Sequence, residues 1–200
     1  MDETSDILDT ARQDNIARIL EAAERLFRHY GYAKTNVADI ARDLGMSPAN
    51  IYRFFASKTE IHQAICGRML AGSYQQAFEI SQLPISAADR LRRYLHAEYQ
   101  LILTAMLDHE KVHEMVIVAI ERDWHVIEKH IDRMHLLLEE MIRQGIAAGE
   151  FAEQDVAVAA RSFGAATVIM CHPQLVAQCL SKPNRATPDE ITEFAIKALR

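Results

Sequence analysis

The sequence predicts an all-α protein of about nine helices, arranged as a small N-terminal three-helix domain and a larger C-terminal helical domain. Residues that favour helices dominate the chain, and only 7 Gly and 5 Pro interrupt 200 residues. Apolar residues recur every three or four positions through most of the chain, which is the period of a helix with one buried face. A composition of 50% hydrophobic and 25% charged residues is typical of a folded globular protein.

The first two predicted helices are separated by a glycine turn. An amphipathic pattern runs from about Ala11 to Tyr30, and Gly31 follows it as the expected C′ residue. Thr35-Asn36 then supplies an N-cap for a short helix over residues 37–44. Gly45 is expected to end that helix with a backbone at positive φ.

The third and fourth helices begin at recognisable caps. Ser47 and Pro48 form an N-cap and N1 pair, because proline lacks an N–H that this position does not use. The helix that they open is short and ends near Phe55. Ser57 with Glu60 three residues later resembles a capping box, which predicts a long helix reaching Gln82.

The C-terminal part of the chain continues as helices after a break at Pro84. The pattern predicts helices over residues 86–106, 109–119, 121–148, 155–170 and 187–199. The segment 155–170 is apolar on most of its sides. A helix of that kind needs more than one surface to pack against, which is either the core plus a second subunit or burial on all sides.

The net charge of −6 is unevenly distributed along the chain. Residues 1–11 carry four acidic and no basic residues, and we expect them to form a flexible acidic arm. Residues 12–58 carry eight basic and five acidic residues, whereas residues 59–200 carry 14 basic and 19 acidic residues. This mildly basic N-terminal domain on an acidic body is compatible with contact to nucleic acid. The boundary between the two domains is expected near Lys58, inside a continuous helix.

Three short helices within about 45 residues, with a glycine turn between the second and third, describe a helix-turn-helix unit. Ala41 is the small residue where two helices approach each other, and Gly45 takes the turn. Ile51, six residues later, is expected to pack back between the helices. Many helical hairpins satisfy this spacing, so the spacing alone leaves DNA binding open.

The residues around this unit closely resemble the DNA-binding domain of the TetR family of transcriptional regulators. The matching positions are Ile19-Leu20, Ala22-Ala23, Leu26-Phe27, Gly31-Tyr32, Thr35, Ile40-Ala41, Gly45-Met46-Ser47, Ile51-Tyr52, Phe55 and Lys58. Two departures fall on the recognition helix: Ala49, where the family often has Gly, and Phe54, where it often has His. They leave the operator sequence open.

The resemblance implies a short recognition helix whose first turn enters the major groove of double-stranded operator DNA. The predicted DNA-binding residues are Thr35, Ser47, Pro48, Ala49, Asn50, Tyr52, Arg53 and Lys58. Arg53 can read guanine and Ala49 can touch a thymine methyl group, while Tyr52, Thr35 and Lys58 suit phosphates. Asp39, Arg42 and Asp43 are expected on a solvated face.

For the C-terminal domain, the resemblance implies a pocket for a small-molecule effector and a dimer interface. Residues 155–170 and 187–199 are the predicted homodimer helices. The predicted pocket wall consists of Tyr99, Ile102, Met106, Met115, Trp124, Ile127, Phe163 and Met170. Most of such an apolar stripe is ordinary core, so fewer than half of these residues are expected to touch a ligand. The function predicted from the whole is a repressor that an effector releases from palindromic operator DNA.

One segment supports alternatives. His109, Glu110 and His113 match HExxH, which places two imidazoles on one helical face. A metal-responsive regulator would use His109 and His113 with a further histidine such as His96 or His130, and a zinc hydrolase would use Glu110 as its base. No further zinc ligand is evident downstream, and histidines on a helix surface or a pocket edge explain the same pattern. We therefore predict no enzyme activity, no cofactor and no resident metal.

The N-terminal sequence, the length of the apolar runs and the spacing of the cysteines predict a cytoplasmic protein. The N-terminus is acidic and lacks the order of a signal peptide. No apolar run reaches the roughly 18 residues of a membrane helix, so no membrane partner is expected. The 3 cysteines form no CxxC pair, which argues against a disulfide framework or a zinc ribbon.

Overall fold

The computed structural model describes residues 3–107, 115–119, 124–180, 182 and 184–200, with side chains omitted at 3–8, 105–107 and 124. All regular structure in these ranges is helical, which confirms the all-α prediction. The chain divides into two compact units. One comprises Met1–Arg68 with His109–Asp123, and the other comprises Met69–Asp108 with Trp124–Arg200. The division falls inside helix α4 (Lys58–Ser81), beyond the boundary that we expected near Lys58.

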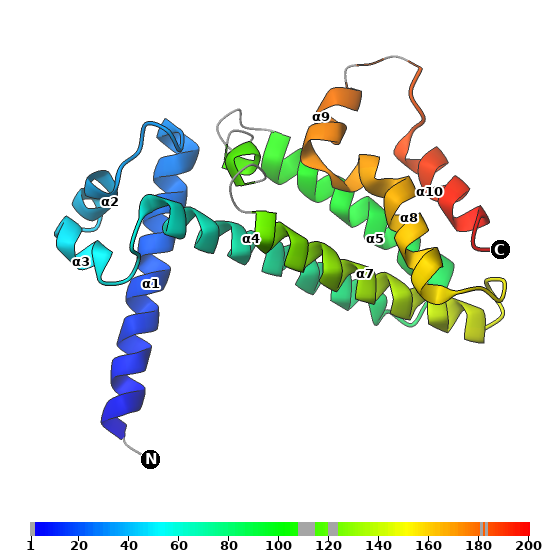
Figure 1. The fold of residues 1–200 in the computed structure, drawn as a ribbon, viewed down its shortest axis with the longest axis horizontal. Helices are drawn as coiled ribbons and strands as arrows, with labels where there is room; N and C mark the ends of the chain where they lie inside the picture. The colour runs from blue at the N-terminus through cyan, green and yellow to red at the C-terminus, as the bar shows by residue number, and fades with distance from the viewer. Residues whose placement is uncertain (1–2, 108–114, 120–123, 181, 183) are drawn as a thin grey trace. The chain divides into compact units, whose positions relative to one another are not determined.

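The first unit contains α1 (Glu3–Tyr30), α2 (Val37–Asp43), α3 (Pro48–Tyr52) and the first part of α4 (Figure 1). Helix α2 packs against both α1 and α3. The core of this unit consists of apolar side chains with no more than 1% of their surface exposed: Ile19, Ala22, Ala23, Phe27, Ile40, Ala41, Ile51, Ile61 and Ile65. Its helices are therefore held by one small hydrophobic core, to which each of them contributes.

Helix α1 begins earlier than the sequence pattern predicted. It starts at Glu3 rather than near Ala11, so most of the segment expected to be a flexible acidic arm is helical. No Gly or Pro occurs between Glu3 and Tyr30, so nothing interrupts helix propagation once the amphipathic part has formed. The end of α1 is as predicted, because Gly31 follows it with φ of 91°.

The predicted caps of the next two helices are present. The Asn36 side chain accepts from the Asp39 backbone N–H at 2.9 Å, and the Asp39 carboxylate accepts from the Asn36 N–H at 3.0 Å. This capping box satisfies two N–H groups at the start of α2 that the helix itself leaves without partners. Ser47 caps α3 by accepting from the Asn50 N–H at 3.2 Å, and Pro48 occupies the first helical position.

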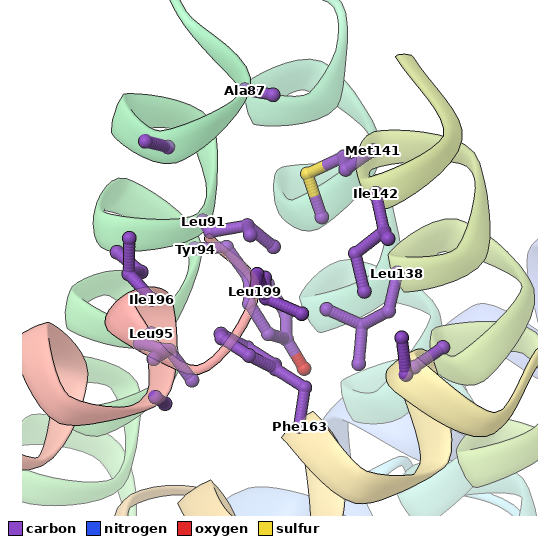
Figure 2. Close-up of a cluster of buried hydrophobic side chains, with 14 of the residues drawn as sticks. Ala87, Leu91, Tyr94, Leu95, Leu138, Met141, Ile142, Phe163, Ile196 and Leu199 are labelled. Atoms are coloured by element: carbon purple, nitrogen blue, oxygen red, sulfur yellow. The ribbon is translucent and has the colours of Figure 1, made fainter. Parts of the chain in front are cut away.

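The second unit is a helical bundle around one large core (Figures 1 and 2). It contains the rest of α4, α5 (Ala87–Leu101), the π-helix η1 (Ile102–Leu107), α7 (Trp124–Ala147), α8 (Val156–Cys171), α9 (Pro173–Leu180) and α10 (Pro188–Lys197). Helix α7 packs on α5 and α8, and α10 packs on the same two helices. Figure 2 shows the side chains that fill the space between them.

Tight turns hold this bundle together at one end. Gly149, with φ of 72°, ends α7, and the Glu150 N–H donates to the Gly145 carbonyl at 2.8 Å. The Glu150 carboxylate then accepts from the backbone N–H groups of Ala87 and Ala88 at 2.9 and 3.1 Å. A carboxylate at this position caps α5 and complements its dipole.

Within the described helices, none is by itself long and apolar enough for a membrane span. The successive helices α8 and α9 reach the necessary length and hydropathy only together, and they are bent by 56° at the break between them.

Candidate functional site

The turn between α2 and α3 has the geometry that the sequence predicted. Gly45 has φ of 66°, a conformation that side chains with a Cβ rarely adopt. The Met46 N–H donates to the Ala41 carbonyl at 2.8 Å, and the Gly45 N–H donates to the Arg42 carbonyl at 3.2 Å. These two hydrogen bonds make a Schellman motif, which ends α2 and turns the chain sharply into α3.

Helix α3 is anchored by one side and exposed on the other. Ile51 is fully buried and holds the helix against the core of the unit. Ser47, Pro48 and Ala49 are exposed at its start. After them, Asn50 is half-buried, whereas Tyr52 is 53% exposed and Arg53 is exposed. A rigidly anchored short helix with an exposed first turn is the arrangement that reads a DNA major groove.

Two side chains that were predicted to contact phosphates donate hydrogen bonds to backbone carbonyls of the protein itself. The Thr35 side chain is 2% exposed, and its hydroxyl donates to the Gly31 carbonyl at 2.9 Å. The Lys58 ammonium donates to the carbonyls of Tyr32 and Thr35, both at 2.9 Å, and lies 4.2 Å from the centre of the Tyr32 ring. Lys58 therefore ties the start of α4 to the loop before α2, and any phosphate contact by Thr35 would use its backbone.

Charged contacts that were not predicted from the sequence connect the helices of this unit. Arg25 on α1 pairs with Asp43 on α2 at 2.5 Å. The Glu24 carboxylate accepts from Arg28 at 2.9 Å and from Arg68 on α4 at 2.5 Å. The i,i+4 spacing of Glu24 and Arg28 predicts their pairing on one face of α1. The other two pairs join residues 18 and 44 positions apart in the sequence, so no local pattern predicts them.

The second unit contains a surface pocket of about 620 Å³ between α5 and α10. It is lined by Gln76, Arg92, Arg93, His96, Ala97, Gln100, Leu101, Thr104, Met170, Pro188, Asp189, Thr192 and Glu193. The Arg92 guanidinium bridges the helices by donating to Glu193 at 2.5 and 3.0 Å and to Asp89 at 2.8 Å. These two carboxylates compensate its charge and raise the pKa of Arg92 above its usual range.

Among the predicted pocket residues, Met170 lines this pocket. Ile102, Phe163 and Met170 are buried, and Tyr99 and Ile127 are half-buried. Met115 is buried in the other unit, while the side chains of Met106 and Trp124 lie outside the described part. A hydrophobic stripe identifies buried positions, but it does not tell a pocket wall from ordinary core.

A buried acid, Glu98, is not among the residues predicted from the sequence. Glu98 is 8% exposed and accepts from the Ser73 hydroxyl at 2.9 Å. Burial is the main cause that raises the pKa of this carboxyl above its usual value of 4.5. The signal was present in the sequence, because Glu98 stands at helical spacing from Leu91, Leu95 and Ile102 on the apolar stripe of α5.

The weak metal candidates His109 and His113 lie outside the described residues. The described part of the chain has no group of three or more His, Cys, Asp or Glu side chains placed to hold a metal ion. His96 lines the pocket between α5 and α10, and burial lowers the pKa of His130.

Two family models match the chain. Residues 19–65 match the model described as bacterial regulatory proteins of the tetR family. Residues 87–192, more than half of the chain, match the model described as the tetracyclin repressor-like C-terminal domain. The two matches cover the helix-turn-helix unit and most of the helical bundle.

Individual relatives agree with the family models. The HTH-type transcriptional regulator TtgR of Pseudomonas putida is 30% identical over 162 residues, covering 74% of this chain and 75% of TtgR. The solved TetR family regulator PfmR of Thermus thermophilus is 28% identical, with a TM-score of 0.59 over 92% of this chain and 97% of PfmR. The FadR regulator of Bacillus subtilis, solved with stearoyl-CoA, shares the fold with a TM-score of 0.65 at 16% identity, over 92% and 99% of the two chains.

Proposed function

Because the chain belongs to the TetR family of transcriptional regulators, we propose that it is a repressor that binds palindromic operator DNA as a homodimer and is released by a small-molecule effector. The observation that carries the DNA-binding part is the exposed first turn of α3, held in place by the buried Ile51. The proposal for release rests on the helical bundle and its pocket.

Side chains on α3 have distinct proposed roles. We propose that Arg53 and Asn50 reach base edges and that Ala49 contacts a thymine methyl group. Ser47 and the Tyr52 hydroxyl suit phosphates, which set the register of the protein on the duplex. Lys58 is proposed to act by positioning, since its ammonium already holds the loop before α2.

Fluorescence anisotropy with DNA from upstream of the protein's own gene tests this assignment. We expect Arg53→Ala to weaken specific binding by about 1–3 kcal/mol, and Tyr52→Ala to weaken binding to specific and non-specific DNA alike. Arg42→Ala is the matched control, since it removes one positive charge from an exposed side chain on α2 that pairs with Asp39. Specific binding that survives both α3 substitutions, or falls equally with the control, would place the readout elsewhere.

Dimerisation through α8 and α10 is supported by apolar side chains that the single chain leaves exposed. Phe194 on α10 is 73% exposed, and Val158 and Val168 on α8 are 49% and 42% exposed. These residues lie inside the predicted segments 155–170 and 187–199. Covering them in a symmetric interface removes apolar surface from water, which favours association.

The dimer test compares two equally simple substitutions. Phe194→Asp is expected to convert the dimer to a monomer in analytical ultracentrifugation, because it places a charge in the proposed interface. Leu136→Asp is the control, since Leu136 on α7 is 65% exposed and lies outside both proposed helices. A monomeric wild type, or dissociation by the control alone, would contradict the assignment.

The effector is proposed to bind in the second unit. Its pocket of about 620 Å³ combines the apolar Ala97, Leu101 and Met170 with polar groups, and this volume is in the range of small-molecule sites. FadR of Bacillus subtilis, which shares the fold, was solved in complex with stearoyl-CoA. Small molecules that lower anisotropy of the wild-type complex with DNA would identify the effector class.

A further inference from the structure

Glu98 is a buried carboxyl group with little compensation around it. It lies on α5, is 8% exposed, and accepts one hydrogen bond from the Ser73 hydroxyl on α4. In the described part of the chain, no lysine or arginine forms an ion pair with it. Burial without a cation disfavours the ionised form of a carboxyl group, so an acid that ionises at this position works against the stability of the unliganded fold.

Packing of α5 does not require an acid there. The neighbouring positions of the same stripe, Leu91, Leu95 and Ile102, are apolar and are at most 3% exposed. A leucine or a glutamine at position 98 would continue this stripe without burying a potential charge. A binding partner that supplies a positive charge gives the carboxyl group a function that packing does not.

The surroundings of Glu98 suit one class of cation. The Tyr94 side chain lies one helical turn earlier on α5, is 5% exposed, and belongs to the core cluster (Figure 2). Cys171 on α8 is close enough for Glu98 to contribute to its raised pKa of about 12, whose main cause is burial. An aromatic ring, a carboxylate and apolar side chains together recognise organic cations, through charge pairing and cation–π contact.

We propose that Glu98 anchors an organic cation with an apolar body, and that this is the effector class of the protein; the inference rests on the proposed role of this domain as an effector sensor. A divalent metal ion is a poorer occupant, since Ca²⁺ and Mg²⁺ need six or more oxygen ligands. The described residues here offer the Glu98 carboxylate with the hydroxyls of Ser73 and Tyr94. An anionic ligand would be repelled by the carboxylate.

The pocket between α5 and α10 is the proposed route by which the cation reaches Glu98. Ala97 and Met170 line this pocket, whereas Glu98 and Cys171 follow them on the same two helices and lie behind its wall. The pocket lining carries two positive side chains, Arg92 and Arg93, and two negative ones, Asp189 and Glu193, so the charges of the lining balance. The α-helical hydrogen bonding of α5 changes to a π-helix at Ile102, one turn beyond Glu98, and such changes are frequent at functional sites.

The experiment uses two probes of the same shape and opposite charge, the tetraphenylphosphonium cation and the tetraphenylborate anion. Isothermal titration calorimetry on the full-length protein without DNA is expected to show that the cation binds the wild type more tightly than Glu98→Gln by about tenfold or more. Glu153→Gln is the control, because it removes one exposed acidic charge elsewhere and is expected to bind the cation as the wild type does.

A second measurement uses pH. The phosphonium probe does not titrate, and its affinity for the wild type is expected to rise above pH 4.5 as Glu98 ionises, a rise that Glu98→Gln removes. The groups placed around Glu98 are Ser73 on α4, Tyr94 on α5 and Cys171 on α8, and burial raises the pKa of both Tyr94 and Cys171. If Glu98→Gln does not fold, Glu98→Met provides a variant that fits an apolar core.

Equal affinity of the cation for the wild type and Glu98→Gln would overturn the proposal, as would tighter binding of the borate or binding of neither probe. These titrations contain no DNA, so they can fail while the anisotropy experiments succeed. Conversely, a chain that binds the cation through Glu98 but binds no operator would contradict the proposed repressor function alone.

Discussion

Replacing Gly145 by alanine is expected to destabilise the helical bundle through one defined clash. A Cβ at this position would overlap the Cδ2 and Cε2 atoms of Phe151 and would lie 2.9 Å from the Ala87 Cβ. Favourable carbon–carbon contacts are about 3.5–4.0 Å long, so the neighbours must move. Phe151 is 5% exposed in the core, and the Gly145 carbonyl accepts from its N–H at 3.3 Å, which restricts that movement.

The expected loss in the free energy of unfolding of Gly145→Ala follows from a comparison with Gly72→Ala in α4. Both glycines are inside helices, so alanine gains about 0.5–1 kcal/mol of helix stability at each. A Cβ at Gly72 meets nothing within 4 Å. The difference between the two variants therefore isolates the clash, for which overpacking in a core gives about 1–3 kcal/mol.

Urea unfolding followed by circular dichroism measures this difference. Protein concentration is held constant, because dimerisation would make the apparent stability depend on it. We expect Gly72→Ala to be more stable than the wild type and Gly145→Ala to be less stable than Gly72→Ala by the stated amount. Equal free energies of unfolding for the two variants would refute the packing of Gly145 against Phe151.

Three further predictions test local features. Gly45→Ala is expected to lose about 1–2 kcal/mol of stability, since its left-handed backbone disfavours a Cβ although the space around it is open; chemical denaturation measures the loss, and an unchanged stability would exclude the positive φ. Asn36→Ala removes the Asn36 side-chain acceptor of the capping box and is expected to lower the free energy of unfolding by about 1 kcal/mol, measured by chemical denaturation. An equal loss in Lys34→Ala, which changes an exposed side chain, would show that the cap is not the cause. The raised pKa of Glu98 means that the folded state keeps the proton of this carboxyl group to higher pH than the unfolded state does. The stability that the protonated carboxyl group contributes is therefore present below pH 4.5 and is lost as pH rises through the folded-state pKa. Thermal unfolding from pH 4.5 upward should show wild-type stability falling relative to Glu98→Gln, and parallel curves would contradict the burial of this carboxyl group.

Local sequence determined the helix-turn-helix unit and most of the other helices, although the pattern did not predict α9. Asn36, Ser47 and Pro48 act within three or four residues of where they stand, so their capping roles follow from spacing alone. Gly45 similarly carries its own conformational requirement, because only the absence of a Cβ makes positive φ inexpensive. The predicted start of α1 was wrong, because amphipathic periodicity marks only the part of a helix that packs against a core. The helix itself continues until a residue such as Gly or Pro interrupts it.

Tertiary structure decided which side chains are available for function. Thr35 and Lys58 stand at positions that suggest phosphate contacts, yet their hydroxyl and ammonium groups hold the loop before α2, through contacts up to 26 residues apart in sequence. The pocket draws its lining from helices more than 100 residues apart, and an apolar stripe does not show which of its members faces a hollow. Identifying Glu98 required both the sequence and the tertiary structure. The sequence shows that Glu98 stands on the apolar stripe of α5, but only the packing of α4 against α5 shows that its carboxyl group has a single hydroxyl partner in the described chain. Periodicity is a property of one helix, whereas burial and charge compensation belong to the helices that surround it.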